Sequence, residues 1–198
     1  PLAKNLIGIY FAKNSLKPSK SDVINPSRDR VGVLGAGLMG SQIAANLAEK
    51  GYEVTMKDLG TEQLRTGMDR IVKVEQRDLV KRIISQSEFD RRFLRLHPTT
   101  DWGLFRNSSL VIEAVSEKLA VKRTLLEEFE DTVREDTVFA TNTSSLTVAE
   151  IAQNAKHPER CIAMHFFNPL RAMELIEIGV ADFTAPNVVT KAIDLARQ

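Results

Sequence analysis

The chain has one cysteine, no long apolar run and no excess of either sign of charge. A single cysteine excludes an internal disulfide, and with it the disulfide-rich class of small secreted domains. No apolar run reaches the ~18–20 residues that a membrane-spanning helix requires. The 27 Lys and Arg residues are balanced by 26 Asp and Glu residues. This balance gives no general reason to expect nucleic acid or an anionic membrane surface as a partner.

Cysteine and histidine are also too scarce to form a ligand cluster, so no metal is predicted. Cys161 lies in an apolar segment without a cysteine partner, which favours a small buried hydrophobic residue over a nucleophile. Trp102 and Phe105 are expected to pack in the core or under a loop. The remaining composition, 43% hydrophobic and 27% charged, is typical of a globular domain that buries a core without crosslinks.

The first thirty residues differ from the rest of the chain. Residues 1–16 place Leu2, Leu6 and Ile9 near one face of a predicted helix, and residues 17–30 form a polar, proline-containing linker. The chain begins with proline rather than methionine, so we expect a piece of a longer protein. Residues 1–29 would then be a linker helix and connector from a preceding domain. The alternative is a helix that packs on its own domain.

Residues 30–198 alternate between predicted strands and helices. Strands are expected at 31–34, 52–57, 110–115, 137–141, 161–166 and 173–178. Helices are expected at 38–50, 119–133, 148–154 and 186–197, with two more between 61 and 96 that are separated near 85–87. This alternation predicts an α/β fold of the Rossmann type: a doubly wound, mostly parallel sheet with helices on both faces.

A glycine-rich loop joins the first predicted strand to the first helix. It has the sequence Gly-Ala-Gly-Leu-Met-Gly at 35–40, and its position between a strand and a helix is the context that makes this motif meaningful. Gly35 allows the tight turn, Gly37 lets the backbone approach a pyrophosphate, and Gly40 lets the helix pack close to the strand. The helix N-terminus then offers free N–H groups to the phosphates. The loop therefore predicts a dinucleotide site.

An acidic residue ends the second predicted strand. Asp58 lies 18 residues after Gly40, where a carboxylate can accept hydrogen bonds from both hydroxyls of the adenosine ribose. It would repel a 2′-phosphate, so NAD is favoured over NADP, although the neighbouring Lys57 could soften this preference. A helix N-cap or turn residue is the alternative interpretation of Asp58.

One of the three histidines ends an apolar strand. His97 and His157 each precede a proline; we expect His97 in a strand or loop and His157 at the surface. His165, in contrast, follows the apolar run 161–164. The carboxyl ends of parallel strands face the ligand crevice. A carboxylate from the next segment, Glu174 or Glu177, could bond one imidazole nitrogen and leave the other as a base. A purely structural histidine is the alternative.

The polar run Thr-Asn-Thr-Ser-Ser at 141–145 also follows a predicted strand. It is therefore expected to line the same crevice. Its alternative role is to cap the next helix.

Together these segments resemble the NAD-binding domain of the 3-hydroxyacyl-CoA dehydrogenases, from about residue 30 to the end of the chain. Four motifs carry the resemblance: the glycine loop at 35–40, Val-Ile-Glu-Ala-Val-Ser-Glu at 111–117, Thr-Asn-Thr-Ser-Ser at 141–145 and His-Phe-Phe-Asn-Pro at 165–169. The last begins 21 residues after Ser144 and is highly specific.

The resemblance implies a role for individual residues. His165 would be the general base that takes the proton of the 3-hydroxyl, Glu177 its carboxylate partner, and Ser144 a contact to substrate and cofactor. Besides Gly35, Gly37, Gly40, Asp58 and Ser144, the implied NAD contacts are Leu38, Met39, Val115, Glu117, Lys122 and Asn168. Without the resemblance, Glu117 and Lys122 would be assigned to the solvated start of a helix. Glu113 and Glu174 receive no role.

The N-terminal segment looks more loosely like the multifunctional α-subunit of fatty-acid oxidation, through residues 6–10, the lysine-rich linker and His97-Pro98-Thr99. That resemblance implies an acyl-CoA substrate, a preceding hydratase domain, a thiolase subunit as partner, and the bacterial cytoplasm or the mitochondrial matrix as compartment. The family completes its site with an asparagine of a following helical domain. Because we expect that domain to be absent from these 198 residues, we expect NAD binding with weak or no turnover.

Two other functions stay open. A 3-hydroxyisobutyrate-type or other β-hydroxyacid dehydrogenase shares the glycine loop, but it would leave His-Phe-Phe-Asn-Pro unexplained. A non-catalytic NAD-binding relative would keep the fold without turnover.

Overall fold

A computed structural model describes residues 29–173 and 175–198 of the chain. The predicted linker helix at 1–16 and nearly all of the connector lie outside the described residues, as does Glu174. Among the described helices, none is both long enough and apolar enough to cross a membrane.

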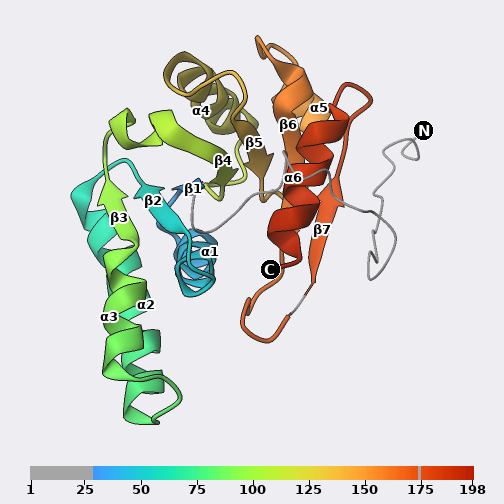
Figure 1. Ribbon diagram of the computed structural model, residues 1–198. Helices are drawn as coiled ribbons and strands as arrows, with labels where there is room; N and C mark the ends of the chain where they lie inside the picture. Colours follow the sequence, from blue (N-terminus) through green and yellow to red (C-terminus); the bar gives the residue numbers. More distant parts are fainter. Residues whose placement is uncertain (1–28, 174) are drawn as a thin grey trace.

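Seven strands form one sheet in the order β3-β2-β1-β4-β5-β6-β7 (Figure 1). Six strands are parallel, and β7 pairs antiparallel with β6 at one edge. The strands are β1 (Arg30–Leu34), β2 (Glu53–Lys57), β3 (Leu96–Thr99), β4 (Ser108–Glu113), β5 (Val138–Thr141), β6 (Cys161–Phe166) and β7 (Ile176–Gly179). The central strands β1, β4 and β5 are almost wholly buried, as a sheet covered on both faces requires.

Helices cover both faces of the sheet and make two separate hydrophobic cores. On one face pack α1 (Leu38–Glu49), α2 (Thr61–Val80) and α6 (Pro186–Ala196). On the other pack α4 (Leu119–Thr132), the short α5 (Val148–Ile151) and the 3-10 turn at Gly103–Asn107. The last helix, α3 (Gln86–Leu94), lies beside α2 at the β3 edge (Figure 1). The predicted doubly wound, mostly parallel fold is therefore confirmed.

Several element boundaries differ from the sequence prediction, and β4 spans 108–113 rather than 110–115. Residues 96–99 form the edge strand β3, which can include Pro98 because an edge position tolerates a missing N–H donor. The strand β7 begins at 176 rather than 173, because the N–H groups of Ala172 and Met173 close a turn on the Pro169 carbonyl. The helix α5 ends at Ile151 rather than 154.

Candidate functional site

The glycine loop leaves β1 and enters α1 with a geometry that requires glycine at two positions. Gly35 has φ +102°, in the left-handed region, and its N–H donates to the Lys57 carbonyl at 2.7 Å. A Cβ at Gly40 would overlap the Gly35 carbonyl oxygen. A Cβ at Gly37, in contrast, would meet no protein atom within 4 Å. Gly37 also precedes α1 without a capping side chain, so this helix start is open to an anionic ligand.

Asp58 lies against the glycine loop. Its Oδ2 accepts a hydrogen bond from the Ala36 N–H and its Oδ1 one from the Leu59 N–H, both at 2.7 Å. The residue that precedes α2 as N-cap is Gly60, so Asp58 does not have the alternative capping role. Lys57 is buried, and its ammonium lies over the Trp102 ring, 5.1 Å from the ring centroid. The carboxylate is thus held where the loop turns, as a ribose site requires.

A buried ion pair supports the second wall of the crevice. Lys122 is 1% exposed, and its ammonium donates to both oxygens of Glu113, at 2.8 and 2.9 Å. Glu113 also accepts hydrogen bonds from the Thr141 hydroxyl and the Val115 N–H. The sequence alone indicated no role for Glu113. Its signal was an acidic residue that ends an apolar strand, nine positions before a lysine.

Of the two charged residues predicted to contact NAD from this wall, only Glu117 is open to solvent. Its side chain is 47% exposed and accepts the Thr143 hydroxyl at 2.5 Å. The Lys122 ammonium lies 3.6 Å from Glu117 but is enclosed by Glu113. A direct contact between Lys122 and the cofactor stays a prediction, whereas its hold on Glu113 is visible in the structure.

His165 and Glu177 face each other across the antiparallel pair of β6 and β7. They are register partners, and His165 Nδ1 lies 3.1 Å from a Glu177 carboxylate oxygen. Both side chains are partly exposed, at 25% and 29%. Among the described residues, none hydrogen-bonds the other ring nitrogen, Nε2. This is the arrangement expected of a histidine oriented by a carboxylate and free to exchange a proton.

Ser144 lines the same cavity, of about 300 Å³, as His165 and Glu177. The cap of α5 is Thr147, which forms a capping box with Glu150. The run 141–145 therefore does not cap this helix, and its alternative assignment was wrong. Ser144 is exposed, while the neighbouring Thr143 hydroxyl accepts the N–H groups of Ser145 and Leu146 and so shapes the loop.

Amide side chains hold the segment that follows His165. Asn142 accepts the Phe166 N–H at 2.9 Å through its Oδ1. Gln42, on α1, donates to the Asn168 oxygen at 3.0 Å and accepts the Leu170 N–H at 3.1 Å. The predicted NAD contact Asn168 thereby lies beside the helix that follows the glycine loop.

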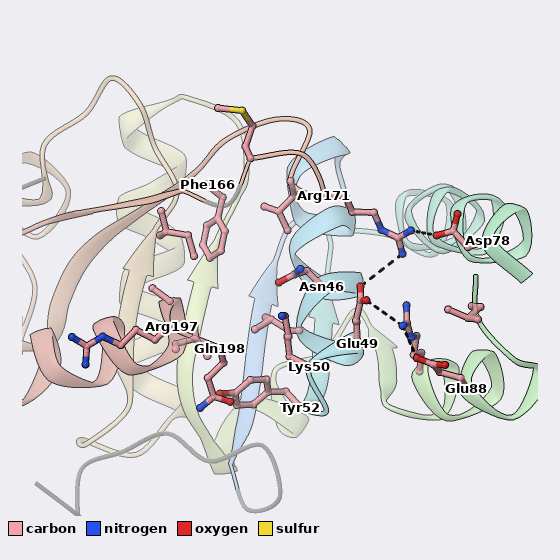
Figure 2. A pocket seen from close by; sticks show the side chains of 18 of the residues that line it. Asn46, Glu49, Lys50, Tyr52, Asp78, Glu88, Phe166, Arg171, Arg197 and Gln198 are labelled. Atoms are coloured by element: carbon pink, nitrogen blue, oxygen red, sulfur yellow. Dashed lines mark hydrogen bonds and ion pairs between the residues drawn. The ribbon is translucent and has the colours of Figure 1, made fainter. Parts of the chain in front are cut away.

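A larger cavity, of about 770 Å³, lies on the α1 side of β6 and does not include His165 (Figure 2). Its wall contains Arg171, whose guanidinium pairs with Glu75 and Asp78 of α2. Arg92 of α3 also pairs with Glu75, at 3.1 Å, and with Glu49 at the end of α1. This network joins three helices to the segment after β6.

The remaining candidate groups lie elsewhere. His97 pairs with Glu53 at 2.7 Å and His157 with Glu159 at 3.2 Å. Burial raises the pKa of the Cys161 thiol to about 12, in agreement with a buried hydrophobic role. Within the described part of the chain, no three His, Cys, Asp or Glu side chains come together as a metal site.

Comparison with known proteins identifies the domain. Residues 30–198 match the family model described as "3-hydroxyacyl-CoA dehydrogenase, NAD binding domain". The chain belongs to this family. The site of this family binds NAD, and the open helix start at Gly37 and the held carboxylate of Asp58 fit that cofactor.

Individual relatives agree with this family assignment. The chain is 33% identical over 198 residues to the fatty acid oxidation complex subunit alpha of Psychrobacter cryohalolentis, of which it spans 28%, and 32% identical to that of Acinetobacter baylyi, also covering 28%. Among solved structures, the 3-hydroxybutyryl-CoA dehydrogenase of Escherichia coli K12 superposes with a TM-score of 0.83 and 34% identity. The alignment covers 88% of this chain and 36% of that one. The FadB2 protein of M. tuberculosis superposes with a TM-score of 0.82 and 37% identity, in an alignment that covers 85% of this chain and 59% of FadB2.

Proposed function

We propose that this 3-hydroxyacyl-CoA dehydrogenase domain supplies the cofactor site and the catalytic base for NAD-dependent oxidation of (S)-3-hydroxyacyl-CoA to 3-ketoacyl-CoA in fatty-acid oxidation. The observation that carries the proposal is the His165–Glu177 pair at 3.1 Å, in one cavity with Ser144. The family membership and the relatives named as fatty acid oxidation complex subunits support the substrate class.

His165 performs the proton step. Its Nε2 takes the proton of the 3-hydroxyl as the C3–H bond breaks and the C3–O bond gains double-bond character. Glu177, at Nδ1, fixes the tautomer that leaves Nε2 as the acceptor and stabilises the imidazolium that forms. When bound, NAD accepts the hydride that leaves C3. Ser144, which lines the same cavity, orients the substrate oxygen.

The other wall of the crevice binds and orients the cofactor. The first turn of α1 receives the pyrophosphate, and Asp58 receives the adenosine ribose hydroxyls. Glu117 and Val115, on the loop that Glu113 holds through the Val115 N–H, are proposed contacts to the cofactor. Met39, in the first turn of α1, and Asn168, which Gln42 of α1 contacts, are further proposed contacts.

We propose an acyl-CoA as the substrate. We further propose that the domain works together with a hydratase domain and a thiolase subunit, in the bacterial cytoplasm or the mitochondrial matrix. The relatives' naming as complex subunits supports an assembly, since the chain corresponds to 28% of their length. We also propose that the 198 residues alone bind NAD with weak turnover, because the resemblance places one catalytic asparagine in a helical domain.

The test is NADH oxidation with acetoacetyl-CoA, by the 198 residues alone and by the same residues joined to a helical domain of the family. The proposal expects NADH binding by both and rapid turnover only by the second. NADH binding without turnover in either form would support the non-catalytic alternative. Turnover of 3-hydroxyisobutyrate in preference to 3-hydroxybutyryl-CoA would support the β-hydroxyacid alternative. Near-normal oxidation by the 198 residues would contradict the proposal on weak turnover.

A further inference from the structure

We propose that Gln42 fixes the orientation of the Asn168 side-chain amide, so that Asn168 presents its N–H₂ group to an oxygen atom of the bound dinucleotide. The inference rests on the proposed function, because it concerns the same NAD site. Gln42 would be a positioning residue, since it acts through Asn168.

The Gln42 side chain is held at three points. Its Oε1 accepts the Leu170 backbone N–H at 3.1 Å. Its Nε2 donates to the Asn168 Oδ1 at 3.0 Å and lies 3.3 Å from the Leu38 carbonyl oxygen. The contact to Asn168 joins residues 126 positions apart, so it ties the segment after His165 to the helix that follows the glycine loop.

Two of these three partners determine which way the Gln42 amide points. A backbone N–H can only donate, so the Gln42 atom that faces Leu170 must be the oxygen. A backbone carbonyl can only accept, so the atom that faces Leu38 must be the nitrogen. Both constraints agree. The atom of Asn168 that faces Gln42 Nε2 must then be an acceptor, its Oδ1.

The orientation leaves one group of Asn168 for a ligand. Asn168 is exposed, and no described residue accepts a hydrogen bond from its Nδ2. The other end of the segment is held by Arg171, which pairs with Glu75 and with Asp78. Figure 2 shows the contact with Asp78. Because the backbone on the C-terminal side of Asn168 is fastened to α1 and α2, the direction of its amide is set before a ligand binds, which is what preorganisation requires.

The decisive variant is Gln42→Glu. A carboxylate still accepts the Leu170 N–H, but its second oxygen puts an acceptor where Gln42 Nε2 donated to Asn168. We therefore expect Asn168 to turn its Nδ2 toward that carboxylate and its oxygen toward the ligand. Asn46→Asp is the matched control, because it adds the same charge one turn later on α1 without contacting Asn168. Gln42→Leu removes both the oxygen acceptor and the N–H₂ donor of the side-chain amide, and it tests the hold on Leu170.

The measurements are NAD affinity by calorimetry and hydrogen exchange of the Leu170 amide, both on the 198-residue chain. For Gln42→Glu we expect NAD to bind roughly 5- to 10-fold more weakly than to Asn46→Asp, which is the effect of one lost hydrogen bond, with the Leu170 amide still protected. For Gln42→Leu we expect exchange at Leu170 to accelerate by roughly tenfold.

Two results would overturn the inference. Gln42→Glu with the NAD affinity of Asn46→Asp would show that the orientation of Asn168 is irrelevant to binding. Unchanged exchange at Leu170 in Gln42→Leu would show that the contact does not hold the segment in solution. A wild-type chain that binds no NAD would overturn the proposed function as well, whereas either result above, with normal wild-type binding, overturns this inference alone.

Discussion

Glu113 and Lys122 form an ion pair that is almost completely shielded from water, at 0% and 1% exposed. The ammonium bonds both carboxylate oxygens, and the Thr141 hydroxyl and the Val115 N–H complete the acceptor sites. The pair thus joins the ends of β4 and β5 to α4, beneath the loops that carry Glu117 and Ser144. A buried pair of this kind depends on both partners, because either charge alone is poorly solvated.

Removing one member of this pair should destabilise the domain strongly. For Glu113→Gln we expect a loss of about 3–5 kcal/mol in the free energy of unfolding, because the buried Lys122 ammonium loses the carboxylate that it bonds at both oxygens. The half-exposed Glu117 carboxylate, at 3.6 Å, replaces it only in part. Urea unfolding followed by circular dichroism measures it. The double variant Glu113→Leu/Lys122→Met should recover most of the loss, since it buries no charge.

An exposed ion pair provides the control for this prediction. Arg65 and Glu62, on α2, are both largely exposed, so Arg65→Ala should leave the unfolding midpoint nearly unchanged. Equal effects of Glu113→Gln and Arg65→Ala would show that the buried pair has no special importance.

Asp58 should determine the choice between NAD and NADP. For Asp58→Ala we expect NAD binding to weaken by roughly 10- to 100-fold, because charge-assisted hydrogen bonds to the ribose and to the glycine loop are lost. NADP binding should weaken less or improve, because the repulsion of the 2′-phosphate is removed. Calorimetric titration with both cofactors measures the ratio, and an unchanged ratio would place the ribose elsewhere.

Much of this site was predictable because its signals are local. The glycine loop, the strand that precedes it and Asp58 lie close together in the chain, and each needs a particular residue type for a reason of backbone geometry. The fold followed from the alternation of strands and helices. The residues alone predicted only that a carboxylate from the next strand would contact His165. The strand register decides that this carboxylate belongs to Glu177.

The parts that the sequence did not predict depend on partners distant in the chain. Nothing near Gln42 indicates that it bonds Asn168 and Leu170, because that contact exists only once the sheet is assembled. The same holds for Glu113 and Thr141, 28 residues apart. At His97 the sequence left a strand and a loop open, because the four residues of β3 include Pro98, which argues against a strand except at an edge.

Cys161 should be inert in the native protein and should contribute to alkaline unfolding. Burial raises its pKa from 9.0 to about 12. Because the folded pKa is the higher one, the stability contribution is fully present below pH 9 and is lost as the pH rises from about 9 to about 12. A thiol reagent at about pH 8 should therefore label the unfolded chain but not the native one. In Cys161→Ala the loss of stability across this pH range should be smaller.

In the proposed reaction, His165 is the base that takes the hydroxyl proton. The most direct measurement compares His165→Ala with wild type, in a protein that carries these 198 residues together with the helical domain. We expect oxidation of 3-hydroxybutyryl-CoA to slow by ~10²–10⁴-fold, the usual contribution of a general base, with NAD affinity unchanged. A loss of NAD affinity, or a rate within a few-fold of wild type, would contradict the role of His165 as the base and leave it as a structural residue.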